Sequence, residues 1–300
     1  MKSVITGATG LIGMRLAQGL DQPTILSRNP ERAQRLMPGA QAVGWAPERE
    51  AAPVSALEGR DVVFHLAGEP VASGRWSDEK KRRIRDSRVI GTQRLLEGLA
   101  ACEHPPKTLV AASAVGFYGD RGDTVLDESS SMGEGYLAEV CRDWETEALR
   151  AESLGIRVVC LRIGIVLAED GGALEQMLPI FRLGGGGKLG SGQQWMPWIH
   201  VDDVVGLLLW SATNPEASGV YNGVAPEPVR NAEFTKSLAA AINRPAFMPV
   251  PRLGLRLLFG EKTSIIMASQ NIQPRRALGD GYRFAFPQLD GALNTLFGAA

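Results

Sequence analysis

The fold is decided by Val4-Ile5-Thr6-Gly7-Ala8-Thr9-Gly10-Leu11-Ile12-Gly13, near the amino end of the 300-residue chain. A run of β-favouring residues ends at Gly7. Two further glycines, Gly10 and Gly13, follow at intervals of three, and an amphipathic helical pattern comes directly after Gly10. Such a strand, turn and helix form a phosphate cradle. The first glycine makes the tight turn, the second admits a pyrophosphate to the bare backbone, and the third lets the helix pack close to the strand. The stretch predicts a dinucleotide site formed by Gly7, Thr9, Gly10, Leu11, Ile12 and Gly13.

The next strand indicates which dinucleotide is bound. It is expected over residues 23–27 and ends at Ser27 and Arg28, where a dinucleotide fold meets the adenosine ribose. An acidic residue there would accept hydrogen bonds from a 2′-hydroxyl, whereas an arginine pairs with a 2′-phosphate. Ser27 and Arg28, with Arg32 one turn on, therefore favour NADP over NAD. The alternative is a solvated arginine after a strand.

Further strands are expected over residues 42–45, 61–68, 108–113 and 157–162, with helices over 79–99 and 136–154 between them. This alternation predicts an α/β fold with a doubly wound parallel sheet. Ligands lie beyond the carboxyl ends of such strands, so the end of the strand over 61–68 is expected to border the cofactor with Leu66, Ala67, Gly68 and Glu69. The basic run over 79–85 is interpreted as the exposed face of a helix.

The composition changes beyond residue 167, where glycine-rich loops and prolines become frequent. We expect residues 1–166 to form the cofactor-binding domain, with 199–222 returning to it, and residues 167–300 to form a smaller C-terminal substrate lobe. In the returning segment a short strand over 199–201 precedes a helix that Asp202 and Asp203 are expected to cap. In the smaller lobe, further helices are expected around 231–243 and 253–259.

Charge and composition narrow the class of protein. The 32 basic and 33 acidic residues give a net charge of −1, which gives no reason to expect nucleic acid or an anionic membrane as a partner. Three scattered cysteines and three scattered histidines indicate neither a disulfide framework nor a metal site. A first strand beginning at Lys2 leaves no room for a targeting peptide, and no apolar run reaches membrane-spanning length. We expect a cytoplasmic protein with a small-molecule substrate, and a homodimer stays open.

The motifs resemble those of the extended short-chain dehydrogenase/reductase superfamily, and the resemblance covers essentially the whole chain. It rests on Thr6-Gly7-x-x-Gly10-x-x-Gly13, Leu66-Ala67-Gly68, Tyr118-Gly119-Asp120 and Trp198-Ile199-His200-Val201-Asp202-Asp203. Within the superfamily the chain is similar to an atypical bacterial "epimerase family" group of unassigned activity, through Gly68-Glu69-Pro70-Val71 and Cys141-x-x-Trp144-Glu145. The resemblance implies a Rossmann domain that binds NADP or a related cofactor.

Four positions depart from the superfamily pattern. Its catalytic tyrosine is followed four residues later by a lysine, but Tyr136 is followed by Val140. Its catalytic serine falls on Ala114, with Ser113 one residue displaced. Its Asn-x-x-Gly-Thr helix has Arg88 in place of the asparagine, which could reach the cofactor. The arginine that grips a nucleotide-sugar pyrophosphate in epimerases falls on Met196, which cannot make that charge-assisted bond.

These departures leave three functional readings open. The first is an NADP-dependent oxidoreductase acting on a small uncharged or aromatic substrate with a non-standard acid/base group. Ser113, Tyr118 and Tyr136 are the hydroxyl candidates, and Glu139 or Glu145 could supply a carboxylate. The second is an NADPH-binding sensor or assembly protein without turnover, which the missing lysine motivates. The third is a nucleotide-sugar epimerase or dehydratase.

Overall fold

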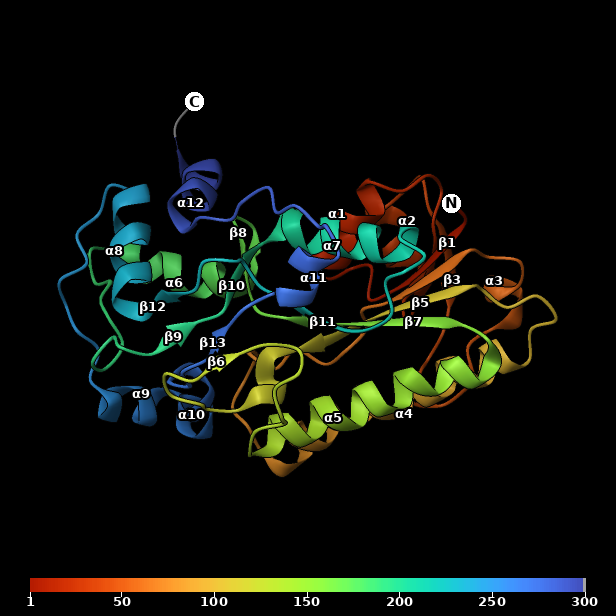
Figure 1. Cartoon of the computed structure of the whole chain (residues 1–300), viewed down its shortest axis with the longest axis horizontal. Helices are drawn as coiled ribbons and strands as arrows, with labels where there is room; N and C mark the ends of the chain where they lie inside the picture. Colours follow the sequence, from red (N-terminus) through yellow and green to blue (C-terminus); the bar gives the residue numbers. More distant parts are fainter. Residues whose placement is uncertain (299–300) are drawn as a thin grey trace.

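The computed structural model describes residues 1–298, and a seven-stranded parallel sheet runs through its larger part (Figure 1). The spatial order of the strands is β3-β2-β1-β4-β5-β7-β11. Their bounds are β1 Ser3–Thr6, β2 Thr24–Ser27, β3 Gln41–Gly44, β4 Val62–His65, β5 Thr108–Ala114, β7 Arg157–Ile163 and β11 Gly219–Gly223. The order reverses between β1 and β4, so these two strands flank the switch point at which a doubly wound sheet receives its ligand. The predicted Rossmann-type parallel sheet is confirmed.

Helices cover both faces of the sheet because its strands are buried and apolar on both sides. On one face lie α1 (Leu11–Gln18), α2 (Pro30–Leu36) and α7 (Val201–Thr213), and on the other lie α3 (Val54–Leu57), α4 (Asp78–Ala100) and α5 (Tyr136–Leu149) (Figure 1). Each layer has its own hydrophobic core. Leu16, Leu207 and Leu208 belong to the first core, and Leu95 and Leu99 belong to the second.

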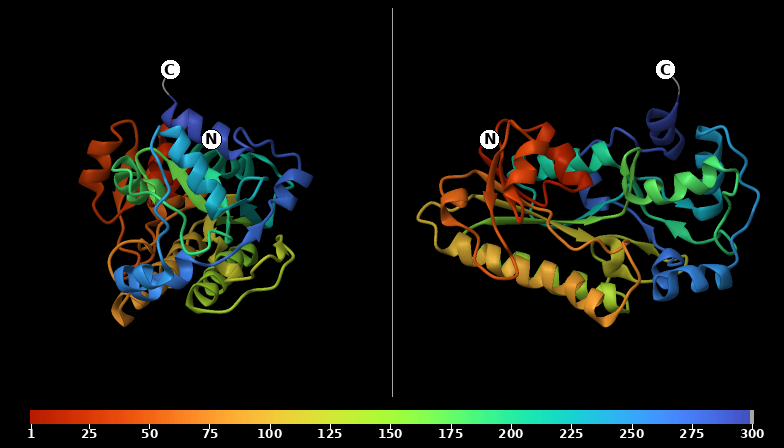
Figure 2. Two further views of the ribbon diagram at one scale, coloured as in Figure 1. Left: turned by 90° about the vertical axis from the view of Figure 1, so that its left-hand side faces the viewer. Right: turned by 180° about the vertical axis from the view of Figure 1, so that it is seen from behind.

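The smaller lobe lies beyond the carboxyl end of the sheet (Figure 2). Its core packs α6 (Gly172–Arg182), α8 (Asn231–Ala241) and α12 (Leu289–Phe297) around the fully buried Trp198 and Phe234. Three two-stranded sheets complete it: β8 (Ile165–Ala168) with β10 (Trp198–His200), β9 (Trp195–Met196) with β12 (Val229–Arg230), and β6 (Val125–Leu126) with β13 (Asn271–Ile272). The remaining helices are α9 (Arg252–Phe259), α10 (Thr263–Ile266) and α11 (Arg275–Gly279), with short 3₁₀ turns η1 (Val115–Tyr118), η2 (Arg150–Leu154) and η3 (Gly260–Lys262).

The chain crosses between the two parts more than once. After β10 it returns to the sheet as α7 and the edge strand β11, and Ala277 of α11 packs into the same core as α1 and α7. Both parts therefore contribute residues to the walls of the space between them. Every helix within residues 1–298 is too short or too polar to cross a bilayer.

Two local expectations differ from the structure. The predicted helix over 136–154 ends at Leu149 and continues as the 3₁₀ turn η2, which stops at Gly155 in a left-handed conformation with φ of 75°. The predicted capping of α7 by Asp202 and Asp203 is wrong. The cap is His200, whose Nδ1 accepts the backbone N–H of Asp202 at 3.1 Å, while the Asp203 carboxylate accepts the N–H groups of Ala285 and Phe286.

Candidate functional site

The three glycines of the first turn differ in how much room each would leave for a side chain. Gly7 has φ of +74°, and a Cβ there would lie 2.7 Å from the backbone carbon of Leu66 on the neighbouring strand's extension. A Cβ on Gly13 would lie 2.4 Å from the carbonyl oxygen of Gly7, because α1 packs directly on the turn. A Cβ on Gly10 would meet only that same oxygen, at 3.4 Å. The fold thus requires Gly7 and Gly13, whereas Gly10 keeps open the space in front of the helix.

The amino end of α1 faces that space. Its N-cap, Gly10, offers no side-chain acceptor, so the first backbone N–H groups of the helix keep no side-chain partner. Such amides and the helix dipole attract a negative group. The predicted residues Gly7, Thr9, Gly10, Leu11, Ile12 and Gly13 all line one large cleft. The geometry fits a pyrophosphate.

At the adenosine end, β2 is followed by Ser27 and Arg28. The Ser27 hydroxyl accepts the N–H of Asn29 at 3.1 Å, and Asn29 in turn caps α2. The Arg28 side chain is 70% exposed, and its Nη1 lies 3.8 Å from the Glu48 carboxylate, which is itself 44% exposed. So loose an ion pair leaves the guanidinium available to a phosphate. Neither Ser27 nor Arg28 borders the large cleft itself.

A buried chain of hydrogen bonds holds the turn after β4 against the glycine loop. The Ala67 N–H donates to Thr6 Oγ1, which lies 2.8 Å from Nδ1 of His65. On the other side of the ring, Nε2 of His65 lies 3.0 Å from Thr92 Oγ1, whose hydrogen goes to the Arg88 carbonyl. Because the Thr92 hydroxyl donates its hydrogen to that carbonyl, it can only accept from His65, so Nε2 of His65 donates and Nδ1 accepts. Burial lowers the pKa of His65 to about 4, which keeps this one neutral tautomer.

Of the four predicted cofactor residues after β4, Leu66 lines the large cleft, whereas Ala67, Gly68 and Glu69 do not. The guanidinium of Arg88 packs flat on Gly68, where a Cβ would lie 3.1 Å from its Cζ. Glu69 instead pairs with Lys80 at 2.6 Å, and this hydrogen bond lowers the pKa of its carboxyl. The Lys80 side chain is only 7% exposed, so the interpretation of 79–85 as an exposed face is wrong at this position.

Arg88 borders the cleft from α4. Its Nη1 donates to the carbonyls of Glu69 and Ile84, both at 3.0 Å, and its Cζ lies 5.0 Å from the ring of Trp144. Burial lowers its pKa. The side chain therefore braces the turn after β4 and presents a cation at the wall of the cleft.

Ser113 and Tyr118 do not face the cleft, so the structure does not support them as catalytic hydroxyls. The Ser113 hydroxyl donates to Glu145 at 2.5 Å, and both side chains are buried. Arg162 completes the cluster by donating to both oxygens of Glu145 and to the hydroxyl of the fully buried Tyr118. Glu145 is consequently engaged in a buried ion pair. The other carboxylate candidate, Glu139, is exposed and does not border the cleft.

Tyr136 is the one hydroxyl candidate whose side chain borders the cleft. Its hydroxyl donates to the backbone carbonyl of Lys81, and its ring packs edge-on against Trp76 at 5.6 Å. Burial raises the pKa of this phenol, with Arg88 acting in the opposite direction. Tyr136 therefore stays protonated at neutral pH and gives its proton to a backbone partner.

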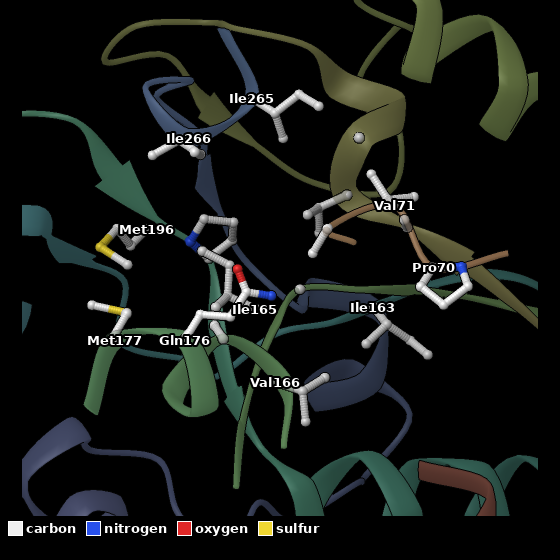
Figure 3. Close-up of a pocket in the computed structure, with 18 of the residues that line it drawn as sticks. Pro70, Val71, Ile163, Ile165, Val166, Gln176, Met177, Met196, Ile265 and Ile266 are labelled. Atoms are coloured by element: carbon white, nitrogen blue, oxygen red, sulfur yellow. The ribbon is translucent and has the colours of Figure 1, made fainter. Parts of the chain in front are cut away.

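The cleft occupies about 2270 Å³ between the carboxyl edge of the sheet and the smaller lobe. Beyond the glycine turn its walls are mainly apolar (Figure 3). The labelled side chains face a common space from the turn after β4, from β7 and β8, from α6, from β9 and from α10. They are Pro70, Val71, Ile163, Ile165, Val166, Gln176, Met177, Met196, Ile265 and Ile266.

Sequence reasoning missed much of this wall. The segment from α9 to α10 was expected only as an isolated helix, yet Leu255, Thr263, Ile265 and Ile266 border the cleft. Met196 was identified, and the structure shows how it is held, because the Asn231 amide lies 3.2 Å from its sulfur. The signal for the rest was weak, since a short pair of isoleucines such as Ile265-Ile266 looks like ordinary core sequence.

Comparison with known proteins gives matches along most of the chain. Residues 3–223 match a family model described as the NAD dependent epimerase/dehydratase family, and residues 250–296 match one described as a domain of unknown function, DUF1731. The epimerase family protein SDR39U1 homolog, chloroplastic, of Arabidopsis thaliana is 41% identical over 298 residues, covering 97% of this chain and 85% of the relative. Epimerase family protein YfhF of Bacillus subtilis is 36% identical over 304 residues, covering 99% and 98%.

The same similarity extends to three dimensions. The crystal structure of human epimerase family protein SDR39U1 (isoform 2) with NADPH superposes with a TM-score of 0.89 at 34% identity, covering 99% of each chain.

Proposed function

The chain belongs to the NAD dependent epimerase/dehydratase family, and we propose that within it this protein is an NADP(H)-dependent oxidoreductase acting on a small uncharged or aromatic substrate. The observation that carries the proposal is the space in front of Gly10, where uncapped helix amides meet room for a diphosphate. The human relative was crystallised with NADPH, and the loosely paired Arg28 supports the same cofactor here.

The residues of this chain have separable tasks toward such a cofactor. The α1 amides hold the diphosphate, and Arg28 pairs with the 2′-phosphate. The adenosine half lies over β1–β3, so the nicotinamide half lies over β4, β5 and β7, where Leu66, Ala114 and Gly164 border the cleft. The cofactor would supply hydride transfer, while the apolar wall of Figure 3 excludes water from it.

The substrate class follows from Met196. A nucleotide sugar carries a diphosphate, and a methionine gives it no charged hydrogen bond. Its neighbours in the cleft, Met177, Ile165 and Ile266, are also apolar. An uncharged or aromatic substrate avoids burying a phosphate charge against this wall.

The proposal is tested by the cofactor preference. Arg28→Glu should weaken NADPH binding by about 10- to 100-fold, because charge-assisted bonds to the 2′-phosphate are lost, while NADH binding is unchanged or improved. Titration calorimetry with both nucleotides measures this. Arg35→Glu, with the same charge change on the exposed side of α2, serves as the control and should leave both affinities unchanged. A wild-type protein that prefers NADH would contradict the 2′-phosphate argument.

A second candidate is an NADPH-binding protein without turnover. It is favoured by Val140 at the lysine position and by the Tyr136 hydroxyl, which is engaged with the Lys81 carbonyl. The two functions separate when NADPH oxidation is measured over a panel of acceptors. Oxidation that depends on both the protein and the acceptor would reject the non-catalytic function.

A further inference from the structure

The end of the cleft that receives the nicotinamide half contains few groups able to donate a proton. Ala114 stands where the superfamily has a catalytic serine, and it borders the cleft with a methyl group. The hydroxyls of Ser113 and Tyr118 lie in the buried cluster with Arg162, and the Tyr136 hydroxyl donates to the Lys81 carbonyl.

The cations at this end are also engaged. The Lys81 ammonium pairs with Glu261 of η3, and its Nζ lies 5.9 Å from the Tyr136 ring centre. Arg88 donates to two backbone carbonyls. The carboxylates that border this end, Asp120 and Glu134, belong to exposed residues. Among the described residues, the inner wall is thus mainly hydrocarbon and sulfur, and its polar side chains, the amide of Gln176 and the hydroxyl of Thr263, are poor acids where a carbonyl reductase offers a better one.

This arrangement discriminates between hydride acceptors. Adding hydride to an isolated ketone builds an alkoxide, which needs a proton donor or an oxyanion hole in the transition state. A positioned acid contributes about 10²- to 10⁴-fold to such a step. A conjugated ring system spreads the incoming charge over several atoms, so it can take its proton from water after the hydride has arrived.

We infer that the substrate of this cleft is an uncharged planar conjugated hydride acceptor, a quinone or an isoalloxazine, lying between the Met177–Met196 wall and Ile265–Ile266. The inference rests on the proposed function, because NADPH is the hydride donor. The C4–H bond of the reduced nicotinamide breaks with its electron pair, and an O–H bond forms on a quinone oxygen or an N–H bond on flavin N5. NADPH becomes NADP⁺, and the acceptor, having gained two electrons and one proton, is left as the anion of its reduced form. Water then supplies the second proton.

Binding is tested without any nucleotide. Trp76 and Trp195 border the cleft, so menadione (a quinone) and lumiflavin (an uncharged isoalloxazine) should quench tryptophan fluorescence saturably. Met196→Lys should weaken this quenching about tenfold or more by placing a charge on the apolar wall, whereas Met196→Leu should retain it. NADPH affinity and thermal unfolding of both variants establish that they are folded. Quenching by one compound alone identifies the quinone or the flavin as the source, and quenching by neither overturns the inference while leaving NADPH binding, and with it the proposed function, intact.

Turnover is tested with a matched pair of acceptors, menadione and 2-acetylnaphthalene. Both have the same fused bicyclic carbon skeleton and a carbonyl group, but only the ring carbonyls of menadione delocalise the added charge. For each acceptor, the rate of NADPH oxidation with the protein is divided by the rate without it. This ratio should be about 100-fold higher for menadione than for 2-acetylnaphthalene, because reduction of the ketone lacks the contribution of an acid. Comparable reduction of the ketone, lost in Tyr136→Phe or Glu134→Gln, would identify a protein acid and overturn the inference. Absence of NADPH binding would instead overturn the proposed function, and the inference with it.

Discussion

At the scale of single residues, Gly10 and Gly13 distinguish a binding requirement from a folding requirement. Gly13→Ala places a methyl group 2.4 Å from the Gly7 oxygen, so it should lower the free energy of unfolding by about 2 kcal/mol or more. Gly10→Ala meets only an atom at 3.4 Å, so its free energy of unfolding should change by less than about 1 kcal/mol, yet NADPH affinity should fall about tenfold because the methyl group occupies the diphosphate space. Urea unfolding and NADPH titration measure the two effects. Equal NADPH affinity in Gly10→Ala and the wild type would contradict this placement.

His65 makes stability depend on pH. Its pKa is about 4 in the folded protein, against an ordinary value near 6.5, so the unfolded chain binds a proton first as the pH falls. The His65 contribution is fully present above about pH 6.5 and is lost between about pH 6.5 and 4, amounting to about 3 kcal/mol. His65→Gln should flatten the curve of unfolding free energy against pH in this window. His104→Gln, at an exposed histidine, is the matched control and should keep the wild-type slope.

The candidate site was predictable where backbone chemistry defines it and not where long-range pairing does. The glycine spacing predicts the cradle, because Gly7 and Gly13 each meet a local backbone requirement and Gly10 keeps open the space in front of the helix. Ser113 and Tyr118 looked like hydroxyls aimed at a ligand, but Ser113 meets Glu145, 32 residues away, and Tyr118 meets Arg162, 44 residues away. One signal was present: an arginine inside an otherwise apolar strand requires a buried partner.

At the scale of elements, the buried ion pair between Glu145 and Arg162 joins α5 to β7. Glu145→Ala would leave Arg162 buried and unpaired, so the free energy of unfolding should fall by about 3–5 kcal/mol. Glu97→Ala removes the exposed pair with Arg94 on α4 and should cost less than about 1 kcal/mol. Chemical denaturation of both variants makes the comparison. Similar losses in the two would show that the Glu145–Arg162 pair does not stabilise the packing of α5.

Regular elements were predictable from local pattern, whereas short ones depended on their partners. The apolar runs at β1, β4, β5 and β7 predict buried parallel strands, and the predicted boundaries differ from the observed ones by a few residues. The two-residue strands β6, β9, β12 and β13 exist only through pairing, which no local pattern reveals. Helix α6 was missed because it begins at Gly172, directly after Gly171, and contains Pro179, and these residues argue locally against a helix.

At the scale of the whole molecule, the cleft has one wall from each part of the chain. The sheet side supplies β7 and the turn after β4, and the smaller lobe supplies α6, β9 and α10 (Figure 3). Alternation of strands and helices predicted the larger part. The contribution of α9 and α10 was not predictable, since it depends on where a proline-rich tail folds back against residues far away in sequence.

Two contacts join the segment from α9 to α10 to the opposite side of the cleft and should control the mobility of this wall. Glu261 pairs with Lys81 of α4, and the ammonium of Lys262 donates to the Ala72 carbonyl at 2.8 Å. The double variant Glu261→Gln/Lys262→Met removes both charged contacts, so residues 252–266 should open more often and exchange their backbone amide hydrogens about tenfold faster, a loss of about 1.4 kcal/mol of local stability. Hydrogen exchange followed by mass spectrometry measures this, with the buried strand β7 as the internal reference that should not change. The control is Lys236→Met on α8, which removes an exposed cation that makes no ion pair with any described residue. Unchanged exchange over 252–266 in the double variant would mean that burial of Leu255 and Thr263, rather than these two contacts, holds the wall closed.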